Sequence, residues 1–387
     1  MLIIQIIQII LLVYLGFASL YIFIFGFASL FPARKKEVIR SDKRKYAVLI
    51  PGYKEDQVII EVAEDALNQD YPKELYDVII IADSFQKETL TTLKKLPIQV
   101  TEVSFDLSTK SKALNVAMDQ LPDIYDVAVV LDADNLMETD FISKINDAFN
   151  MGYIAVQGHR IAKNYNTPFA ILDAISEEVN NKIFRKGHRV LGFSAALIGS
   201  GMAMDYNYFK TMMKSIKAVG GFDKEIELQM LKEGIRIEFL NDAIVYDEKV
   251  QKAEVFSNQR KRWLSAQLHY FSMDFMNSLK HLILYGNYDY FDKAIQFIQP
   301  PRVMLLGLLF LINIISVLFN PAFCVNLWLA VLTLCILTFI ITIPIKFYNF
   351  NTLKAVLTLP KAFTLIILSL FKIKGANKKF IHTEHGT

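Results

Sequence analysis

Charged side chains are missing from two long stretches of the chain and concentrated between them. Residues 2–31 and 303–345 contain no Asp, Glu, Lys or Arg. A helix needs roughly 20 apolar residues to cross a bilayer, so the first stretch predicts one transmembrane helix over 1–32. The second stretch breaks at Asn320-Pro321. It therefore predicts a transmembrane helical hairpin over 302–346.

Two further segments mix apolar and charged positions. The segment 271–300 combines aromatic and charged residues, and 353–387 begins with an apolar stretch that contains Lys354 and Lys361. Such mixtures are typical of helices that lie in the membrane interface. We therefore expect three membrane spans, interfacial helices over 271–300, and an interfacial helix followed by a cytoplasmic tail over 353–387.

Between the membrane segments, over 45–270, short apolar runs alternate with helical patterns. Strands are predicted by apolar runs at 46–50, 77–82, 98–103 and 127–131. Apolar residues at helical spacing predict helices over 58–67 and after Lys110, and Thr139 is placed to cap a helix through residue 149. This alternation predicts an α/β domain whose mostly parallel sheet is covered on both faces.

The chain is too apolar for an ordinary soluble domain and too charged for a simple membrane bundle. Its 387 residues are 53% hydrophobic and 21% charged, with a mean hydropathy of +0.30. The net charge is only +3, which gives no reason to expect a nucleic-acid partner. Both cysteines, Cys324 and Cys335, lie in the second apolar stretch. This position indicates small core side chains rather than a disulfide or a metal site.

Basic residues follow the apolar segments. The linker after the first stretch contains Arg34, Lys35, Lys36, Arg40, Lys43, Arg44 and Lys45. The tail contains Lys372, Lys374, Lys378 and Lys379. Because Lys and Arg accumulate on the cytoplasmic side of membranes, we predict a multi-pass protein of the cell membrane. Its α/β domain and its C-terminal end are expected in the cytoplasm.

The candidate chemistry centres on Asp132-Ala133-Asp134, directly after the apolar run at 127–131. Two carboxylates at the end of a buried strand can converge on a hard cation such as Mg²⁺ or Mn²⁺. Taken by itself, the Asp132-Ala133-Asp134 motif has an alternative interpretation, which is an exposed acidic turn without a ligand. Glu55, Asp83 and Lys110 also stand after successive elements. Ligands of open α/β sheets bind at the carboxyl ends of strands, so these residues are expected to line one crevice.

These motifs, in this order, resemble the membrane-embedded family 2 glycosyltransferases, whose familiar members are the hyaluronan, chitin and cellulose synthases. The matching residues are Pro51-x-Tyr53-Lys54-Glu55, Asp83-Ser84, Lys110-x-x-Ala113-Leu114-Asn115, Asp132-Ala133-Asp134, Gly199-Ser200-Gly201 and Gln259-Arg260-Lys261-Arg262-Trp263. The resemblance covers 45–270, and the Gln259-x-x-Arg262-Trp263 signature before membrane segments is its most specific part.

The resemblance implies a GT-A (Rossmann-like) nucleotide-sugar fold, a divalent metal and inversion at the anomeric carbon. It implies that Glu55 and Asp83 contact the nucleoside and that Lys110 approaches the diphosphate. Asp132 and Asp134 are expected to hold the metal, with Asp132 also contacting the nucleotide sugar.

Three further donor-side residues and an acceptor motif complete the predicted site. Gln259, Arg262 and Trp263 are expected on the donor, since a guanidinium can grip a phosphate and an indole can stack on a sugar or base. The alternative for this basic and aromatic segment is an anchor at the membrane surface. At Gly199-Ser200-Gly201, the small residues would let the backbone approach an acceptor sugar closely.

The catalytic base is the place where the chain departs from its relatives. They carry an acid pair whose Asp is the general base, whereas this chain reads Phe222-Asp223-Lys224-Glu225-Ile226-Glu227. A gap-free count back from Gly234 places Asp223 on the base, and a shift of two residues would place Glu225 there. Glu227 lies one turn from Asp223 and can share its face. Alternatively, these acids only favour a helix N-terminus.

A long helix is expected from Thr167-Pro168 to about residue 186. Its acids Glu177 and Glu178 are interpreted as a solvated face. We predict no site residue within this helix.

The sequence therefore predicts an inverting glycosyltransferase that uses a nucleotide sugar, expected to be UDP-linked. Its acceptor would be a growing polysaccharide or a glycolipid at the membrane. Two alternatives stay open: a single-transfer enzyme with a lipid-phosphate acceptor, and a nucleotide-sugar sensor without catalysis. A homo-oligomer also stays open. A transporter is disfavoured because the two apolar stretches contain no charge.

The predicted topology can be tested with reporters. A reporter fused after Thr387 should read cytoplasmic and a tag before Met1 external, because the basic segments stay on the cytoplasmic side. Protease protection in sealed vesicles would measure both. An external C-terminal reporter would show that 353–371 crosses the membrane.

Overall fold

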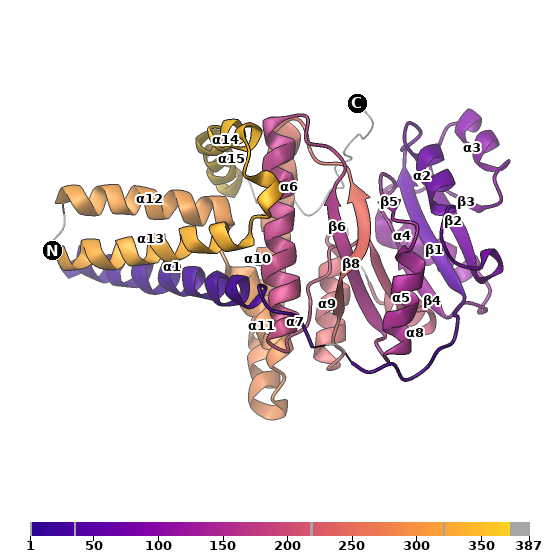
Figure 1. Cartoon of the computed structure of the whole chain (residues 1–387), viewed down its shortest axis with the longest axis horizontal. Helices are drawn as coiled ribbons and strands as arrows, with labels where there is room; N and C mark the ends of the chain where they lie inside the picture. The colour runs from indigo at the N-terminus through magenta and orange to yellow at the C-terminus, as the bar shows by residue number, and fades with distance from the viewer. Residues whose placement is uncertain (1, 35, 217–219, 320–321, 372–387) are drawn as a thin grey trace.

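The computed structural model describes residues 2–34, 36–216, 220–319 and 322–371. Of the sequence predictions, the break at Asn320-Pro321, Lys35 and the basic tail after residue 371 lie outside the described residues. The described chain divides into an α/β domain around one sheet and a set of long apolar helices that extends away from it (Figure 1).

One eight-stranded sheet forms the centre of the α/β domain (Figure 1). In spatial order its strands are β3 (Gln99–Val103), β2 (Tyr76–Asp83), β1 (Tyr46–Tyr53), β4 (Val127–Val130), β7 (Met202–Asp205), β6 (Ala155–Ala162), β8 (Glu238–Asp247) and β5 (Leu136–Met137). β3, β2, β1 and β4 are parallel, and so are β6 and β8. β7 is antiparallel to both of its neighbours, and β5 is antiparallel to β8. The predicted α/β fold with a mostly parallel sheet is confirmed.

Helices cover both faces of this sheet because successive residues of its central strand are all apolar. In β1, Val48 and Ile50 share a core with residues of α2 (Ile59–Ala66) and α5 (Phe141–Asn150). Ala47 and Leu49 point to the opposite face. There they share a core with residues of α4 (Lys110–Gln120), α8 (Tyr206–Met213) and α9 (Phe222–Lys232). α3 (Lys87–Leu93) lies beside the edge strand β3 (Figure 1).

The predicted starts of the strands and of α2 and α4 agree with the structure to within one residue. The start of α5 differs, because its N-cap is Asp140 and not Thr139. The backbone N of Phe141 donates to the carbonyl of Glu138 at 2.9 Å, which closes a turn there, and the carbonyl of Thr139 accepts from Asp70 N at 2.6 Å. This turn delays the first helical residue to Phe141.

The long helix after β6 begins as predicted, at Thr167, whose Oγ1 accepts from the backbone N of Ala170 at 3.1 Å. It comprises α6 (Pro168–Asn180), the π-helix η2 (Asn181–Gly187) and α7 (His188–Val190). The prediction that Glu177 and Glu178 form a solvated face is wrong, since both are buried. Their burial is possible because side chains of neighbouring elements pair with them: the cations Arg160, Lys249 and Lys346, and the His159 ring.

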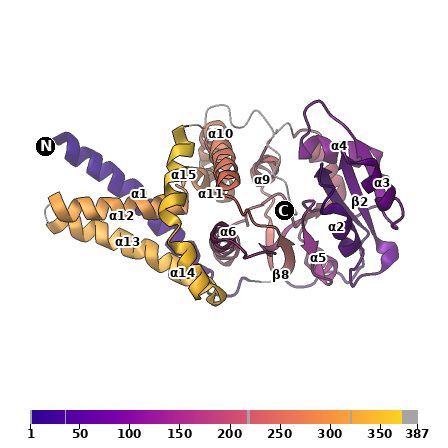
Figure 2. The ribbon, with the colours of Figure 1, turned by 90° about the horizontal axis from the view of Figure 1, so that it is seen from above.

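Four segments are long and apolar enough to cross a membrane: Gln5–Ala28, Arg302–Phe319, Val325–Thr342 and Phe350–Leu368. The first three belong to α1 (Leu2–Ala28), α12 (Arg302–Phe319) and α13 (Ala322–Thr342), which pack into one bundle (Figure 1). The fourth is interrupted between α14 (Phe350–Val356) and α15 (Leu359–Phe371) and runs across the bundle in Figure 2. These apolar helices indicate membrane association. The interfacial position of α14 and α15 and the side of the α/β domain stay predictions.

A helical hairpin of α10 (Ala253–Tyr285) and α11 (Tyr288–Ile298) connects the α/β domain to the bundle (Figures 1 and 2). Its charges have buried partners: Lys293 Nζ lies 2.7 Å from Glu227, and Asp292 lies 3.1 Å from His188. Asp292 also accepts a hydrogen bond from the Tyr21 hydroxyl of α1 at 2.7 Å. The interfacial location of this segment stays a prediction, but polar contacts hold α11 to both neighbouring parts.

The π-helix packs directly against α1. A Cβ added at Gly187 would overlap the backbone carbonyl of Phe25, so only glycine allows this close approach. Gly16 lies on α1, and a Cβ added there would meet only Val331 Cγ2, at the ordinary contact distance of 3.7 Å.

We expect Gly187→Ala to destabilise the protein by about 1–3 kcal/mol, because the new methyl group has to push η2 away from α1. Thermal unfolding in detergent measures this loss. Gly16→Ala is the matched control and should leave the melting temperature unchanged or raise it, since alanine favours the helix. Equal melting temperatures for both variants would contradict the close contact.

Candidate active site

Three aspartates from two distant parts of the chain meet at the carboxyl edge of the sheet. Asp132 and Asp134 follow β4, and Asp247 ends β8. One carboxylate oxygen from each lies within 4.8 Å of the others. Asn135 connects the cluster, because its Nδ2 donates to Asp247 at 3.0 Å and to Asp134 at 3.3 Å. Three oxygen donors at one point fit a hard divalent cation.

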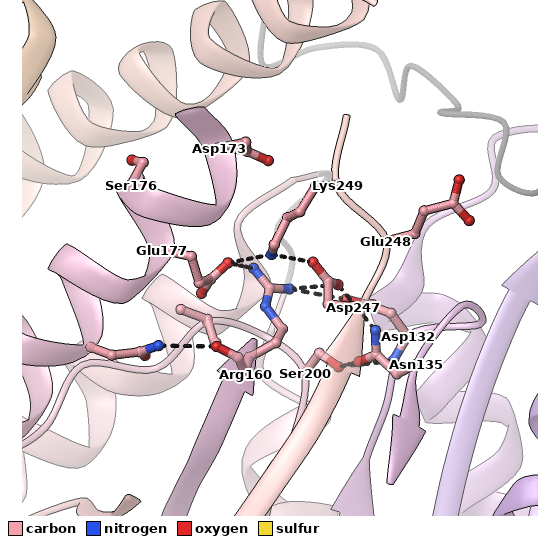
Figure 3. Close-up of polar contacts among 12 residues, drawn as sticks. Asp132, Asn135, Arg160, Asp173, Ser176, Glu177, Ser200, Asp247, Glu248 and Lys249 are labelled. Atoms are coloured by element: carbon pink, nitrogen blue, oxygen red, sulfur yellow. Dashed lines mark hydrogen bonds and ion pairs between the residues drawn. The ribbon is translucent and has the colours of Figure 1, made fainter. Parts of the chain in front are cut away.

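Cationic side chains surround this cluster (Figure 3). Lys110 Nζ lies 2.5 Å from Asp132, and Arg160 Nη1 lies 3.6 Å from Asp132 and 3.3 Å from Asp247. Lys249 Nζ lies 2.6 Å from Asp247 and 2.8 Å from Glu177. Burial alone would raise the pKa of Asp247, but the charges of Arg160 and Lys249 lower it below its ordinary value. The carboxylate therefore stays ionised, as a metal ligand must be.

A polar cavity of about 610 Å³ opens at this edge. All the residues predicted for the donor and the metal line it, namely Glu55, Asp83, Lys110, Asp132, Asp134, Gln259, Arg262 and Trp263. Sequence positions more than two hundred residues apart are thus brought together, as the order of motifs predicts. Their individual contacts with a donor stay predictions.

A second, mostly apolar cavity of about 850 Å³ adjoins the first. Side chains of Lys110, Asp132, Arg262 and Trp263 line both cavities. The second cavity extends from there between the α/β domain and the membrane helices, where its walls include Leu306, Phe310, Phe339, Ile340 and Ile366. The polar centre is therefore continuous with an apolar space beside the helix bundle.

Of the three candidate bases, Asp223 is the one that lines the second cavity. Its side chain is 13% exposed and lies next to Gly199, where an added Cβ would come within 3.4 Å of it. Glu227 is buried, pairs with Lys293 at 2.7 Å and accepts from Leu197 N at 3.2 Å. Neither Glu225 nor Glu227 is among the described residues that line either cavity.

The glycine motif is divided between the cavity and the core. Gly199 lines the apolar cavity, and its carbonyl accepts from Lys110 Nζ at 2.8 Å. Ser200 is buried, and its Oγ accepts from the backbone N of Asp132 at 2.9 Å. Gly201 is buried too, and its carbonyl accepts from Gly158 N at 2.7 Å. Ser200 and Gly201 thus support the loop of Asp132, and only Gly199 faces a cavity.

Sequence reasoning missed Asp247, Arg160 and Lys249. Asp247 ends the apolar run 243–246, as Asp132 ends another, so the same signal was present. Arg160 and Lys249 stand near the ends of β6 and β8 and resemble ordinary loop charges in the sequence. Their role depends on the pairing of β6 with β8, which joins distant segments.

A family model described as "Glycosyltransferase like family 2" matches residues 43–266, which is more than half of the chain. The chain belongs to glycosyltransferase family 2. It therefore has a transferase domain that uses nucleotide sugars, in the part that carries every predicted motif. No curated protein sequence matches the chain.

Two solved structures of glycosyltransferases are similar to this family 2 glycosyltransferase. A mannosyltransferase, PcManGT from Pyrobaculum calidifontis in complex with GDP-Man and Mn²⁺, is 15% identical with a TM-score of 0.55. The match covers 95% of this chain and 98% of that one. Glucosyl-3-phosphoglycerate synthase from Mycobacterium tuberculosis, with Mn²⁺, UDP and phosphoglyceric acid, is 13% identical, with 58% and 78% covered and a TM-score of 0.43. The likeness to the first confirms the GT-A fold with its flanking apolar helices.

We expect Asp134→Asn and Asp247→Asn each to weaken Mn²⁺ binding at least about tenfold, because each removes an anionic oxygen from the cluster. Titration of Mn²⁺ followed by calorimetry would measure the affinity, and turnover would fall with it. Asp123→Asn is the matched control, since the Asp123 side chain is 70% exposed and pairs only with surface Lys210 among the described ion pairs.

Chelation with EDTA should abolish turnover, and adding Mn²⁺ or Mg²⁺ should restore it. Full turnover in EDTA would contradict a metal role for this cluster. An unchanged Mn²⁺ affinity in Asp247→Asn alone would limit the metal site to the Asp132-x-Asp134 motif.

Proposed function

We propose that this enzyme transfers a sugar, with inversion at the anomeric carbon, from a UDP-linked nucleotide sugar to a lipid-linked acceptor held at a membrane. The proposal depends mainly on one observation: a polar cavity with a cluster of three aspartates and an apolar cavity beside the membrane helices meet at Asp132, Arg262 and Trp263. A growing polysaccharide is the other acceptor that the family resemblance implies.

The polar cavity supports a nucleotide-sugar donor. Glu55 and Asp83 are buried acids at the carboxyl ends of β1 and β2, where hydroxyl groups of a nucleoside can donate to them. Lys110, Arg160 and Arg262 are cations around the Asp132 cluster, which fits the two phosphates of the donor. Both GDP and UDP occur in the compared structures, so both belong in a test.

A divalent cation held by Asp132, Asp134 and Asp247 would supply charge that stabilises the leaving nucleoside diphosphate. Lys110 and Arg262 add fixed positive charge on the same side of the site. Burial lowers the pKa of Arg262, while the Asp132 carboxylate opposes that shift. A guanidinium nevertheless stays protonated in proteins, so Arg262 would present a positive charge to the diphosphate of a bound donor.

The apolar cavity supports an acceptor with a hydrocarbon part. Its far walls come from α12, α13 and α15, and its near end is the polar centre. A lipid chain buried between these helices would leave its polar end next to Gly199 and Asp223. Burial of each CH₂ group contributes about 0.8 kcal/mol, so a long chain would bind strongly.

Asp223 is proposed as the general base. Inversion requires that the acceptor hydroxyl attack from the face opposite the leaving diphosphate, losing its proton as it does so. Asp223 lies on the acceptor side, at the first turn of α9, where the helix dipole favours the ionised form. The donated proton would pass from the hydroxyl to this carboxylate.

The reaction itself is tested with protein purified in detergent. A panel of UDP- and GDP-linked sugars with Mg²⁺ or Mn²⁺ and extracted membrane lipid would be followed by release of nucleoside diphosphate. One sugar added to a lipid supports the proposal. A long saccharide product would support a synthase, and tight nucleotide binding without turnover would support the sensor.

Asp223→Asn should lower turnover by about 10²–10⁴-fold, the usual contribution of a general base. Donor affinity should stay near that of the wild type, because Asp223 is not part of the Asp132, Asp134 and Asp247 cluster. Rates and donor binding are measured on the same preparation. Glu225→Gln, on the same helical turn, is the matched control and should cost less.

Two outcomes would contradict this role. An active Asp223→Asn with an inactive Glu225→Gln would place the base two residues later. Near-normal turnover of Asp223→Asn alone would mean that no base is needed, as expected if the attacking oxygen belonged to an ionised phosphate.

A further inference from the structure

The apolar cavity is lined by more basic than acidic residues, and some of these basic residues have no role in the transfer reaction described above. Of the described residues that line it, eight are basic and three are acidic. Several of these cations pair with acids, as Arg260 does with Asp173 and Lys293 with Glu227. Two guanidiniums, Arg185 and Arg302, do not take part in any ion pair among the described residues.

Arg185 comes from the π-helix η2 and is only 2% exposed. Its Nε donates to the carbonyl of Ala196 at 3.1 Å and its Nη1 to Asn181 Oδ1 at 2.7 Å. Both acceptors are neutral. Burial lowers the pKa of Arg185 to about 10, although Glu177 opposes the shift. A buried guanidinium without a carboxylate partner is costly, which indicates that an anion belongs near it.

Arg302 is the first residue of α12, and it lines the same cavity. It donates to Asn180 Oδ1 at 2.5 Å and to the hydroxyl and carbonyl oxygens of Ser176 at 3.0 and 3.1 Å. These acceptors are also neutral. Because Arg302 begins an 18-residue helix, the positive end of the helix dipole lies at this point too.

Gln299 is a second, independent sign of a missing ligand. It lines the cavity three residues before Arg302 and is only 8% exposed. Within the described part of the chain, neither its amide nitrogen nor its amide oxygen has a hydrogen-bond partner. Buried amides are nearly always bonded, so an unpaired one at a cavity wall indicates a polar ligand.

We propose that Arg185, Arg302 and Gln299 bind the phosphate group of an amphiphilic lipid whose hydrocarbon chain occupies the apolar cavity. The inference rests on the proposed function, since it identifies the lipid-linked acceptor as a phosphate ester. The planar guanidiniums bind phosphate oxygens, the Gln299 amide donates to another, and the apolar walls of α12, α13 and α15 cover the chain. The phosphate is a fixed part of the acceptor and holds its reacting hydroxyl near Asp223.

Binding, rather than turnover, tests this site. The probe is a long-chain prenyl monophosphate in nanodiscs, compared with the prenyl alcohol of the same length, and native mass spectrometry or scintillation proximity measures the affinity. The wild type should bind the phosphate at least about tenfold more tightly than the alcohol. Arg302→Gln and Arg185→Gln should each remove most of this difference, and Arg302→Lys should recover part of it.

Arg236→Gln is the matched control, because Arg236 pairs with Asp289 outside both cavities and should leave binding unchanged. The Gln299→Leu variant distinguishes a loss of phosphate binding from a loss of folding. It should weaken phosphate binding while leaving the melting temperature equal or higher, because it removes an unpaired buried amide. Donor affinity in the presence of Mn²⁺ should be that of the wild type in every one of these variants.

Equal affinity for alcohol and phosphate, or unchanged binding in both arginine variants, would overturn the proposal. Competition by inorganic phosphate or UDP at similar concentrations would also overturn it, because the site would then recognise a soluble anion. The proposed transfer can fail while the phosphate site is confirmed. If lipid binding depends on both arginines but no nucleotide sugar is turned over, the lipid-phosphate site is supported and the proposed transfer is rejected.

Discussion

Charge balance at the carboxyl edge of the sheet is the constraint on which the rest of the structure depends. Three aspartates within 4.8 Å of one another would repel strongly in a partly buried place. Arg160 and Lys249 offset this repulsion, and Glu177 on α6 in turn pairs with both of them. Removing one member would leave an uncompensated buried charge, which typically costs about 3–5 kcal/mol. The network therefore links α6 to β6 and to the end of β8.

Ion pairs and hydrogen bonds join the parts of the molecule in addition to the apolar packing that also crosses between them. Lys293 of α11 neutralises Glu227 of α9, and Asp292 links His188 to Tyr21 of α1. Lys293 and Asp292 of the hairpin thus have partners in the α/β domain and in the bundle. The two cavities lie between these linked parts, so their walls are positioned by ion pairs on both sides.

The parallel strands β1 to β4 could be predicted because their apolar runs are short and separated by turn residues, as at 46–50 and 127–131. That Glu55, Asp83 and Asp132 line one cavity could be predicted for the same reason, since the ends of parallel strands meet at one edge. Glu177 could not, because a helix shows its acids at the same spacing whether they face water or a buried arginine. Asp247 needed the pairing of β8 with β6, which no local pattern contains.

The π-helix η2 has a consequence for how this architecture can change. Its wider turn rotates everything that follows by about 100° relative to an uninterrupted helix. Two features lie within this wider segment itself, Arg185 in the cavity wall and Gly187 against the carbonyl of Phe25. A change in the winding of η2 would therefore move both positions together. The shape of the apolar cavity and the docking of α1 thus depend on the same short segment.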